Sequence, residues 1–251
     1  MKIIQVTDLH LVAPGRTLFG LDPLARLDAC LADIEARHAD ADLVIFSGDL
    51  ADRGEAAAYR ALRERLTGLT PPWRLMLGNH DERGSFAEVF PDLIDETGFA
   101  HTAVDTEHGR LLLLDTLVAG EIGGRLCPAR RGWLDARLSE AKDGPVYVFS
   151  HHPPFPVHVP GLDRWPFADA QALHAALQAH GHVRHIFAGH VHRPIAGSWR
   201  GIPFSTLRGT NHQSGLDFSA EDVHPTPDPP AYAIVFITPD DVVVHFHDFP
   251  V

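Results

Sequence analysis

Short apolar runs alternate with stretches of helical periodicity along most of the chain. The apolar runs 2–6, 42–47 and 73–77 are separated by helical stretches at about 23–39 and 55–66, with Glu55 expected in the first turn of the second stretch. Such alternation is typical of strands joined by crossover helices. The first third of the chain therefore has the predicted order β-α-β-α-β.

The remainder continues this pattern and then adds strands without intervening helices. Helical stretches at 129–141 and 169–180 precede the apolar runs 145–150 and 183–188. A hairpin is predicted earlier, and further strands, expected to be antiparallel, are predicted later. These segments are 101–106 with 109–116 for the hairpin, and 195–206, 231–237 and 241–247 for the later strands.

Two loops are longer than the others. They cover residues 153–166 and 207–230 and are rich in proline or polar residues. Long loops without secondary structure of their own often border functional sites, so we expect both to form the rim of one.

Five of the predicted strands end in side chains that can bind metal. These side chains are Asp8 and His10, Asp49, Asn79 with His80, His151, and His190 with His192. In an open α/β sheet the carboxyl ends of the strands lie at one edge, where ligands bind. Residues far apart in sequence are therefore predicted to converge there. Glycines precede three of the ligands, at positions 48, 78 and 189, and are expected to permit tight turns.

Histidine, aspartate and a neutral amide are borderline to hard ligands, which suit manganese, iron, zinc or cobalt. Near the end of a strand, Asp8 and His10 face the same way and can share a metal ion, as can His190 and His192. Neither cysteine is assigned to this chemistry, and Cys30 is expected to be a buried thiol. The set as a whole predicts a site for two metal ions.

Each element also has an ordinary explanation when taken alone. Asp49 suits a helix N-cap, residues 78–81 suit a turn, and His151 with His152 precedes two prolines in what could be a rigid loop. Eighteen histidines in 251 residues give about one His-x-His pair by chance, and the pairs at 180/182 and 245/247 fit a helix end and one strand face. The coincidence at five strand ends favours the metal site over these separate explanations.

Length and charge limit the class of protein. A chain of 251 residues with 45% hydrophobic content is expected to form one domain, residues 1–251. The formal net charge of 21 − 33 = −12 argues against binding to nucleic acid or to an anionic membrane surface. The first apolar run breaks at Gln5, and no later stretch approaches a membrane span, so a cytoplasmic location is expected.

The five strand endings, in order and spacing over residues 3–192, resemble the calcineurin-like metallophosphoesterases. Residues 124–155 also resemble the branch that contains class III cyclic nucleotide phosphodiesterases and glycerophosphodiesterases. The resemblance implies a four-layer α-β-β-α sandwich of the α/β class with two mixed sheets. The chain is short for that branch, which leaves open whether it forms a homo-oligomer.

Carried over residue by residue, the resemblance implies two metal ions that share one bridging carboxylate. The first metal would bind Asp8, His10, Asp49 and His192, and the second would bind Asp49, Asn79, His151 and His190.

The resemblance also implies residues that act without binding metal. His80 would contact the phosphate and the leaving group, with Asp81 as a partner that orients it, and His212 would contact substrate. Asp52 and Arg53 are expected to be structural, in a network that holds Asp49. His152 is expected to point away from His151 and to be a lip residue or a partner of a ligand.

The expected reaction is hydrolysis of a phosphate ester by a metal-activated hydroxide. A small anionic phosphodiester, of the cyclic nucleotide or glycerophosphodiester type, is the preferred substrate, since no basic cluster awaits the second charge of a monoester. A phosphomonoesterase on the same scaffold is the alternative, and the net charge disfavours a nuclease. A non-catalytic protein-binding scaffold is a further alternative, but it has no need of His80 or of the complete ligand set.

Overall fold

The computed structural model describes residues 1–251 and contains two main β-sheets. The first has five strands in the order β13 (Val242–Asp248), β12 (Ala231–Ile237), β1 (Lys2–Val6), β2 (Leu43–Ser47) and β3 (Trp73–Met76). The second has six strands in the order β4 (Thr102–Thr106), β5 (Gly109–Leu114), β6 (Val146–Ser150), β7 (Val183–Ala188), β9 (Ile202–Thr206) and β8 (Ile195–Trp199).

Helices cover the outer faces of both sheets, and short elements lie in the loops. The helices are α1 (Pro23–His38), α2 (Ala56–Leu66), α3 (Arg83–Val89), α4 (Pro128–Ala141), α5 (Pro160–Asp163) and α6 (Ala170–His180), with a 3-10 turn at Pro91–Leu93. The two-residue strands β10 (Gln213–Ser214) and β11 (Pro225–Thr226) pair with each other within the long loop 207–230. No helix has both the length and the apolar character needed to cross a membrane.

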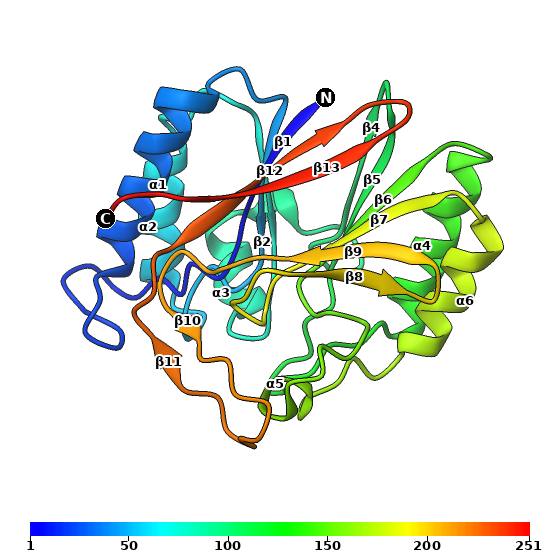
Figure 1. The fold of residues 1–251 in the computed structure, drawn as a ribbon. Coiled ribbons are helices and arrows are strands. Elements are labelled where there is room, and N and C mark those ends of the chain that lie inside the picture. The colour runs from blue at the N-terminus through cyan, green and yellow to red at the C-terminus, as the bar shows by residue number, and fades with distance from the viewer.

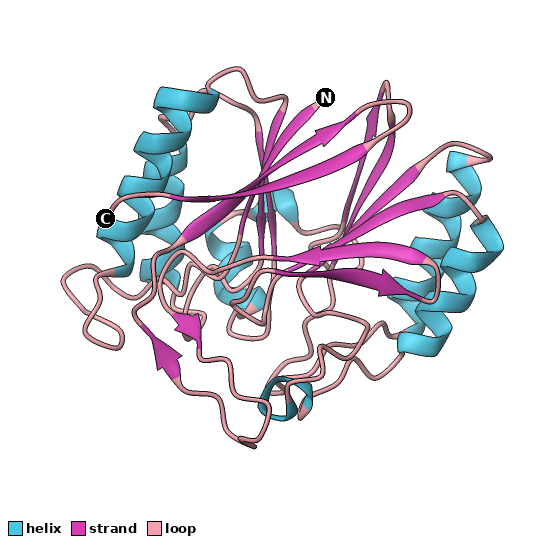
Figure 2. Ribbon diagram, in the orientation of Figure 1, coloured by secondary structure: helices cyan, strands magenta, loops and turns pink.

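The elements form four layers, with α1 and α2 on one outer side and α4 and α6 on the other (Figures 1 and 2). A cluster of buried side chains, which includes Ile45, Leu113 and Phe149, joins the inner faces of the two sheets. Two further clusters pack α1 and α2 against the first sheet and α4 and α6 against the second. The predicted α-β-β-α sandwich is confirmed.

Both sheets are mixed, as predicted. In the first, β1, β2 and β3 are parallel, whereas β12 and β13 are antiparallel to their neighbours. In the second, β5, β6, β7 and β9 are parallel, and β4 and β8 form antiparallel edges. Most parallel pairs are joined by a crossover helix, as a parallel pair needs a crossover connection, whereas β7 and β9 are connected through the edge strand β8.

Local sequence explains where the helices begin and end. Asp22 accepts hydrogen bonds from the backbone N–H groups of Leu24 and Ala25 and so caps α1, which begins with Pro23. The buried side of α1 includes Cys30, as expected. At the end of α6, Gly181 adopts φ 81°, the left-handed conformation that favours glycine at this position.

Three details differ from the sequence prediction. Glu55 is the N-cap of α2 and not part of its first turn. The run 195–206 is the hairpin of β8 and β9 rather than one strand, and β9 is parallel to β7. The short helix α3 was not predicted; it begins at Arg83 because the Glu82 carboxylate accepts from the N–H groups of Gly84 and Ser85.

Candidate metal centre

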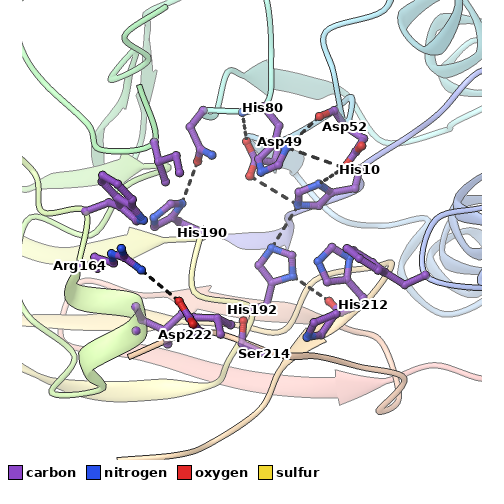
Figure 3. Close-up of a pocket in the computed structure, with 18 of the residues that line it drawn as sticks. His10, Asp49, Asp52, His80, Arg164, His190, His192, His212, Ser214 and Asp222 are labelled. Carbon is purple, nitrogen blue, oxygen red and sulfur yellow. Dashed lines mark hydrogen bonds and ion pairs between the residues drawn. The ribbon is translucent and has the colours of Figure 1, made fainter. Parts of the chain in front are cut away.

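The structure brings the five polar strand endings together, from both sheets rather than from one edge of a single sheet. The endings of β1, β2 and β3 meet those of β6 and β7 between the layers. One group of potential ligand atoms, all within 4.8 Å of one another, comes from Asp8, His10, Asp49 and His192. These are the four residues assigned to the first metal. Figure 3 shows the centre of the site, where His10 and His192 face each other below Asp49.

A second group adjoins the first. The ring nitrogens of His151, His152 and His190 also lie within 4.8 Å of one another, and His190 Nδ1 is 2.8 Å from Asn79 Oδ1. Asp49 lies between the groups, since its Oδ2 is 3.2 Å from His151 Nε2 and 3.5 Å from His10 Nε2. The arrangement places the Asp49 carboxylate in contact with both groups.

The backbone at the site is held in an uncommon conformation. Five of the nine non-glycine residues with positive φ are predicted ligands, namely Asp8, His10, Asp49, His190 and His192, with φ between 45° and 69°. Positive φ is unfavourable for most L-amino acids, although Asp and His tolerate it better than bulky residues. Such strain persists where the surrounding structure requires it, often at functional sites. Asp49 is not the helix N-cap considered above, since α2 has Glu55 at that position.

All three glycines before ligands lack space for a Cβ, and only Gly48 also has a positive φ. Gly48 does have φ 107°, and a Cβ there would lie 2.3 Å from Nδ1 of His151. Gly78 has no positive φ, but a Cβ would lie 2.2 Å from Oδ1 of Asp49. Gly189 is similar to Gly78 and contacts Thr7. The expected tight turn is therefore found at Gly48, whereas Gly78 and Gly189 allow the strand ends to approach one another.

The hydrogen bonds of three histidines leave lone pairs that face the centre. Nδ1 donates to the Asp52 carboxylate in His10 (3.2 Å), to the carbonyl of Ser47 in His151 (2.9 Å) and to the carbonyl of His212 in His192 (2.8 Å). In the neutral rings Nε2 then carries a lone pair. The Nε2 atoms of His10 and His192 are 3.2 Å apart, and Nε2 of His151 is buried without a hydrogen-bond partner.

Lone pairs and carboxylates facing one another need a cation between them. This donor set of imidazole nitrogens and carboxylates therefore fits a bound metal ion, with the Nδ1 bonds fixing the ring orientations. The residues that would hold it are those of the two groups described above. The geometry agrees with the prediction that the site binds metal.

The pKa shifts of the site residues also indicate that the buried carboxylates favour a positive charge beside them. Burial disfavours the charged form of His151, but the carboxylates of Asp49 and Asp8 outweigh it and raise the pKa to about 9. Burial, assisted by His151, lowers the pKa of His190 to about 3. Burial also raises the pKa of Asp49, but His151 and His80 outweigh it and hold the pKa well below its usual value. A metal ion would supply the positive charge in place of protons.

His80 lies beside the ligands and is not one of the four in the first group. Its side chain is 41% exposed, its ring centroid is 4.5 Å from that of His10, and its backbone N–H donates to Asp49 Oδ1. Nδ1 of His80 donates to the backbone carbonyl of Asp52 at 2.8 Å. The ring is thereby oriented with Nε2 available to the cavity.

The expected contact between Asp81 and His80 is absent, and Asp81 has another structural part. Its buried carboxylate accepts hydrogen bonds from the N–H groups of Leu50, Ala51 and Gly78 and from the hydroxyl of Tyr59. Burial and the nearby charge of Asp49 raise its pKa to about 6. Asp81 therefore ties the loop after β2 to the loop after β3, because three backbone donors converge on it.

Asp81→Asn is accordingly expected to lower the melting temperature and weaken metal binding. An amide cannot accept all the hydrogen bonds made by the carboxylate, and a buried donor left without an acceptor costs about 1–3 kcal/mol. Calorimetry and metal analysis measure both effects. Tyr59→Phe removes one donor to Asp81 and the acceptor of the Glu82 N–H but leaves the three backbone hydrogen bonds to Asp81, so it should have a smaller effect. If the Asp81→Asn protein had normal stability and metal content but a reduced kcat, the prediction that Asp81 orients His80 would be supported instead.

Two other expectations need correction. Asp52 does not hold Asp49. Its carboxylate pairs with His10 and its backbone carbonyl accepts from His80. The Arg53 side chain is 76% exposed. His152 is 1% exposed and is not a lip residue. The rings of His151 and His152 lie 4.9 Å apart because the chain bends there and is not extended. Nδ1 of His152 pairs with the hydroxyl of Thr116 at 2.7 Å.

A cavity of about 320 Å³ opens onto the site and is bordered by both long loops. His10, Asp49, Asn79 and His192 form part of its wall, together with His80 and His212. The ring of His212 is 4.5 Å from that of His192, which places it where a substrate in the cavity would lie. From the loops come Arg164 and Asp222, an ion pair of 3.0 Å (Figure 3). These two residues were not predicted, because no strand or motif marks them in the sequence.

The other histidine pairs have the ordinary positions expected of them. His180 is the last residue of α6, and its Nε2 pairs with the carbonyl of Gly144. His247 in β13 contacts Asp33 of α1. The long loops form the rim of the site, as predicted, and the chance explanation of the 190/192 pair is excluded by its position.

Comparison with known proteins identifies this arrangement. Residues 1–194 match the family model of the calcineurin-like phosphoesterases. A probable cyclic nucleotide phosphodiesterase of Rhodopseudomonas palustris is 42% identical over 250 residues, which is 98% of this chain and 91% of that protein. The glycerophosphodiester phosphodiesterase GpdQ of Enterobacter lignolyticus is 30% identical over 230 residues, which is 90% of this chain and 82% of that protein.

The fold is found in solved structures as well. The crystal structure of a dimetal phosphatase from Danio rerio superposes with a TM-score of 0.74 over 98% of this chain and 96% of that one, at 16% identity. At that identity the likeness concerns the fold alone. The family match and the relatives confirm the resemblance noted in the strand endings. The chain belongs to the calcineurin-like phosphoesterase family.

Proposed function

We propose that this protein hydrolyses small phosphodiesters of the cyclic nucleotide or glycerophosphodiester type at a centre of two metal ions. The observation that carries the proposal is the pair of adjoining ligand groups, with Asp49 in contact with both, beneath one open cavity. The family match and the relatives confirm the broader prediction of a metal-dependent phosphodiesterase. Manganese, iron, zinc and cobalt all suit the donor set.

Two metal ions in such a site would activate the attacking water, bind the phosphoryl oxygens and neutralise developing charge. The protein's residues hold the metal ions and orient the substrate. We assign the first ion to Asp8, His10, Asp49 and His192, and the second to Asp49, Asn79, His151 and His190.

The cavity residues complete the proposed chemistry. The Asp52 carbonyl holds Nδ1 of His80, so that Nε2 faces the cavity, where it can serve the leaving oxygen in proton transfer. His212 lies on the wall beside His192 and would contact the substrate. Asp81 does not contact the substrate in this proposal; it holds the loop that carries Asp49.

The charge of the cavity favours a diester over a monoester. Arg164 is the only arginine or lysine in its wall, and Asp222 neutralises it at 3.0 Å. Asp52 and Glu221 also line the wall. A diester carries one negative charge, which the metal ions can neutralise, whereas the second charge of a monoester finds no free cation outside the centre.

The diester bis(4-nitrophenyl) phosphate is therefore expected to show a kcat/KM at least about tenfold above that of 4-nitrophenyl phosphate, a difference of about 1.4 kcal/mol in transition-state stabilisation. The two esters share the leaving group, so their rates can be compared directly. Both are assayed with manganese or cobalt supplied. Equal or reversed values would favour the phosphomonoesterase. No turnover of either ester, with metal bound, would favour a protein-binding scaffold.

Three further expectations remain predictions. A single domain over residues 1–251 is supported by the ligands that both sheets contribute and by the core between the sheets. The cytoplasmic location is supported only by the sequence, which leaves the formation of a homo-oligomer open. Fractionation of cells and light scattering of the purified protein address these two.

A further inference from the structure

Phe19 occupies a backbone position that suits its side chain poorly. Leu18 and Leu21 exchange two backbone hydrogen bonds, of 2.9 and 3.0 Å, across a tight turn made by Phe19 and Gly20. Both central residues have positive φ, 53° for Phe19 and 78° for Gly20, as in a type I′ turn. The first central position of this turn favours Asn, Asp or Gly. A phenylalanine there is strained.

Packing does not explain the choice of phenylalanine. Phe19 is 59% exposed, and its aromatic neighbour is His212, with ring centroids 4.7 Å apart at 64°. A strained backbone with little burial in return is found mainly where a residue serves a function. The turn would be more stable with a small polar residue.

The ring stands in the wall of the cavity above the metal centre. Its neighbour His212 has its own ring 4.5 Å from His192 and 4.8 Å from His10, both ligands assigned to the first metal. His212 lies on the opposite side of the cavity from Arg164 (Figure 3). A substrate with its phosphorus at the metal centre can therefore extend an ester group along Phe19.

We propose that Phe19 selects diesters that carry a planar aromatic ester group, such as a nucleobase, by stacking against that group. The inference rests on the proposed diesterase function for the placement of the phosphate. The ring supplies an apolar face beside His212, in a wall that contains polar and acidic groups and, as its other hydrophobic residues, Ile122, Leu162, Trp165 and Val223. A nucleobase gains from this contact, whereas a glycerol ester has no flat surface to place against it.

The test is Phe19→Asn, which removes the ring and retains a residue that tolerates positive φ. The kcat/KM for adenosine 3′,5′-cyclic monophosphate should fall about tenfold, mainly through KM, in the range that base stacking supplies. The value for glycerophosphoethanolamine should stay within about twofold, since it lacks an aromatic group. The melting temperature should stay equal or rise, because the turn is relieved of strain.

Binding measurements keep this test separate from turnover. By titration calorimetry, adenosine 5′-monophosphate should bind the wild-type protein about tenfold more tightly than ribose 5-phosphate, and Phe19→Asn should remove the difference. Phe218→Asn is the matched control, since Phe218 is 66% exposed in a loop and does not line the cavity. It should leave both ratios unchanged.

The outcomes are distinguishable. If Phe19→Asn lowers activity on both diesters equally, lowers the melting temperature, or leaves the binding ratio unchanged, the inference is wrong. If the wild-type protein hydrolyses neither diester but its preference for the nucleotide depends on Phe19, the diesterase function fails and the selective contact stands.

Discussion

His80→Ala is expected to lower kcat by roughly 10²–10⁴ while metal content stays near normal. His80 lies beside the ligands, and its Nδ1 is held by the carbonyl of Asp52, so the exposed Nε2 can serve the substrate. In the proposed assignment, removal of the ring takes away a proton donor or a charge-stabilising group and no metal ligand. Metal analysis and steady-state kinetics on several diesters measure the two effects separately.

Asn79→Ala is the matched neighbour for this experiment. Asn79 Oδ1 lies 2.8 Å from His190 Nδ1, among the atoms assigned to the second metal. Its loss should lower metal content, and excess metal should restore part of the activity. His80→Ala should show no such rescue. Full activity of His80→Ala on several diesters would refute its assignment, even with both metals bound.

Asp49→Asn is expected to remove most of the bound metal and to lower kcat/KM by more than about 10³, since several kcal/mol of charge stabilisation depend on the metal ions. Asp49 belongs to the first group and also contacts the second, since its Oδ2 is 3.5 Å from Nε2 of His10 and 3.2 Å from Nε2 of His151. An amide retains the shape of the side chain but not the charge that holds two cations. The measurements are metal content and kinetics at saturating manganese.

Asp52→Asn provides a graded comparison, since Asp52 contacts His10 and is not assigned as a metal ligand. An asparagine can still accept from His10 Nδ1, and residues that support a ligand typically contribute 10–100-fold, so a loss of about tenfold is expected. The backbone carbonyl that holds His80 is unchanged.

If Asp49→Asn kept two metal ions and its activity, Asp49 would not be the bridge, and the two-metal assignment would fail.

Local pattern was sufficient to predict most of the fold. The apolar runs and helical periodicity predicted the strands that carry the ligands and the helices between them, because buried faces repeat with the period of the element. Short elements with weak periodicity, such as α3 and the turn that divides β8 from β9, were missed. The parallel pairing of β9 with β7 was also missed, since pairing joins residues distant in sequence.

The candidate ligands are a second feature that the sequence by itself indicated. Asp8, Asp49, His151 and the 190/192 pair each follow a predicted strand, and the structure brings their side chains together. The sequence predicted convergence at one edge of a single sheet, whereas the endings meet between two sheets, because the packing of the layers is not encoded in the local pattern.

Only the tertiary structure decided how the ligands are held and what borders them. Sequence neighbours suggested that Asp81 orients His80, but Asp81 faces the N–H groups of Leu50 and Ala51, and the carbonyl of Asp52 orients the histidine. Hydrogen bonds depend on directions in space that adjacency along the chain does not specify. The same holds for Phe19, whose position in the cavity wall depends on a turn and a loop that meet across almost two hundred residues.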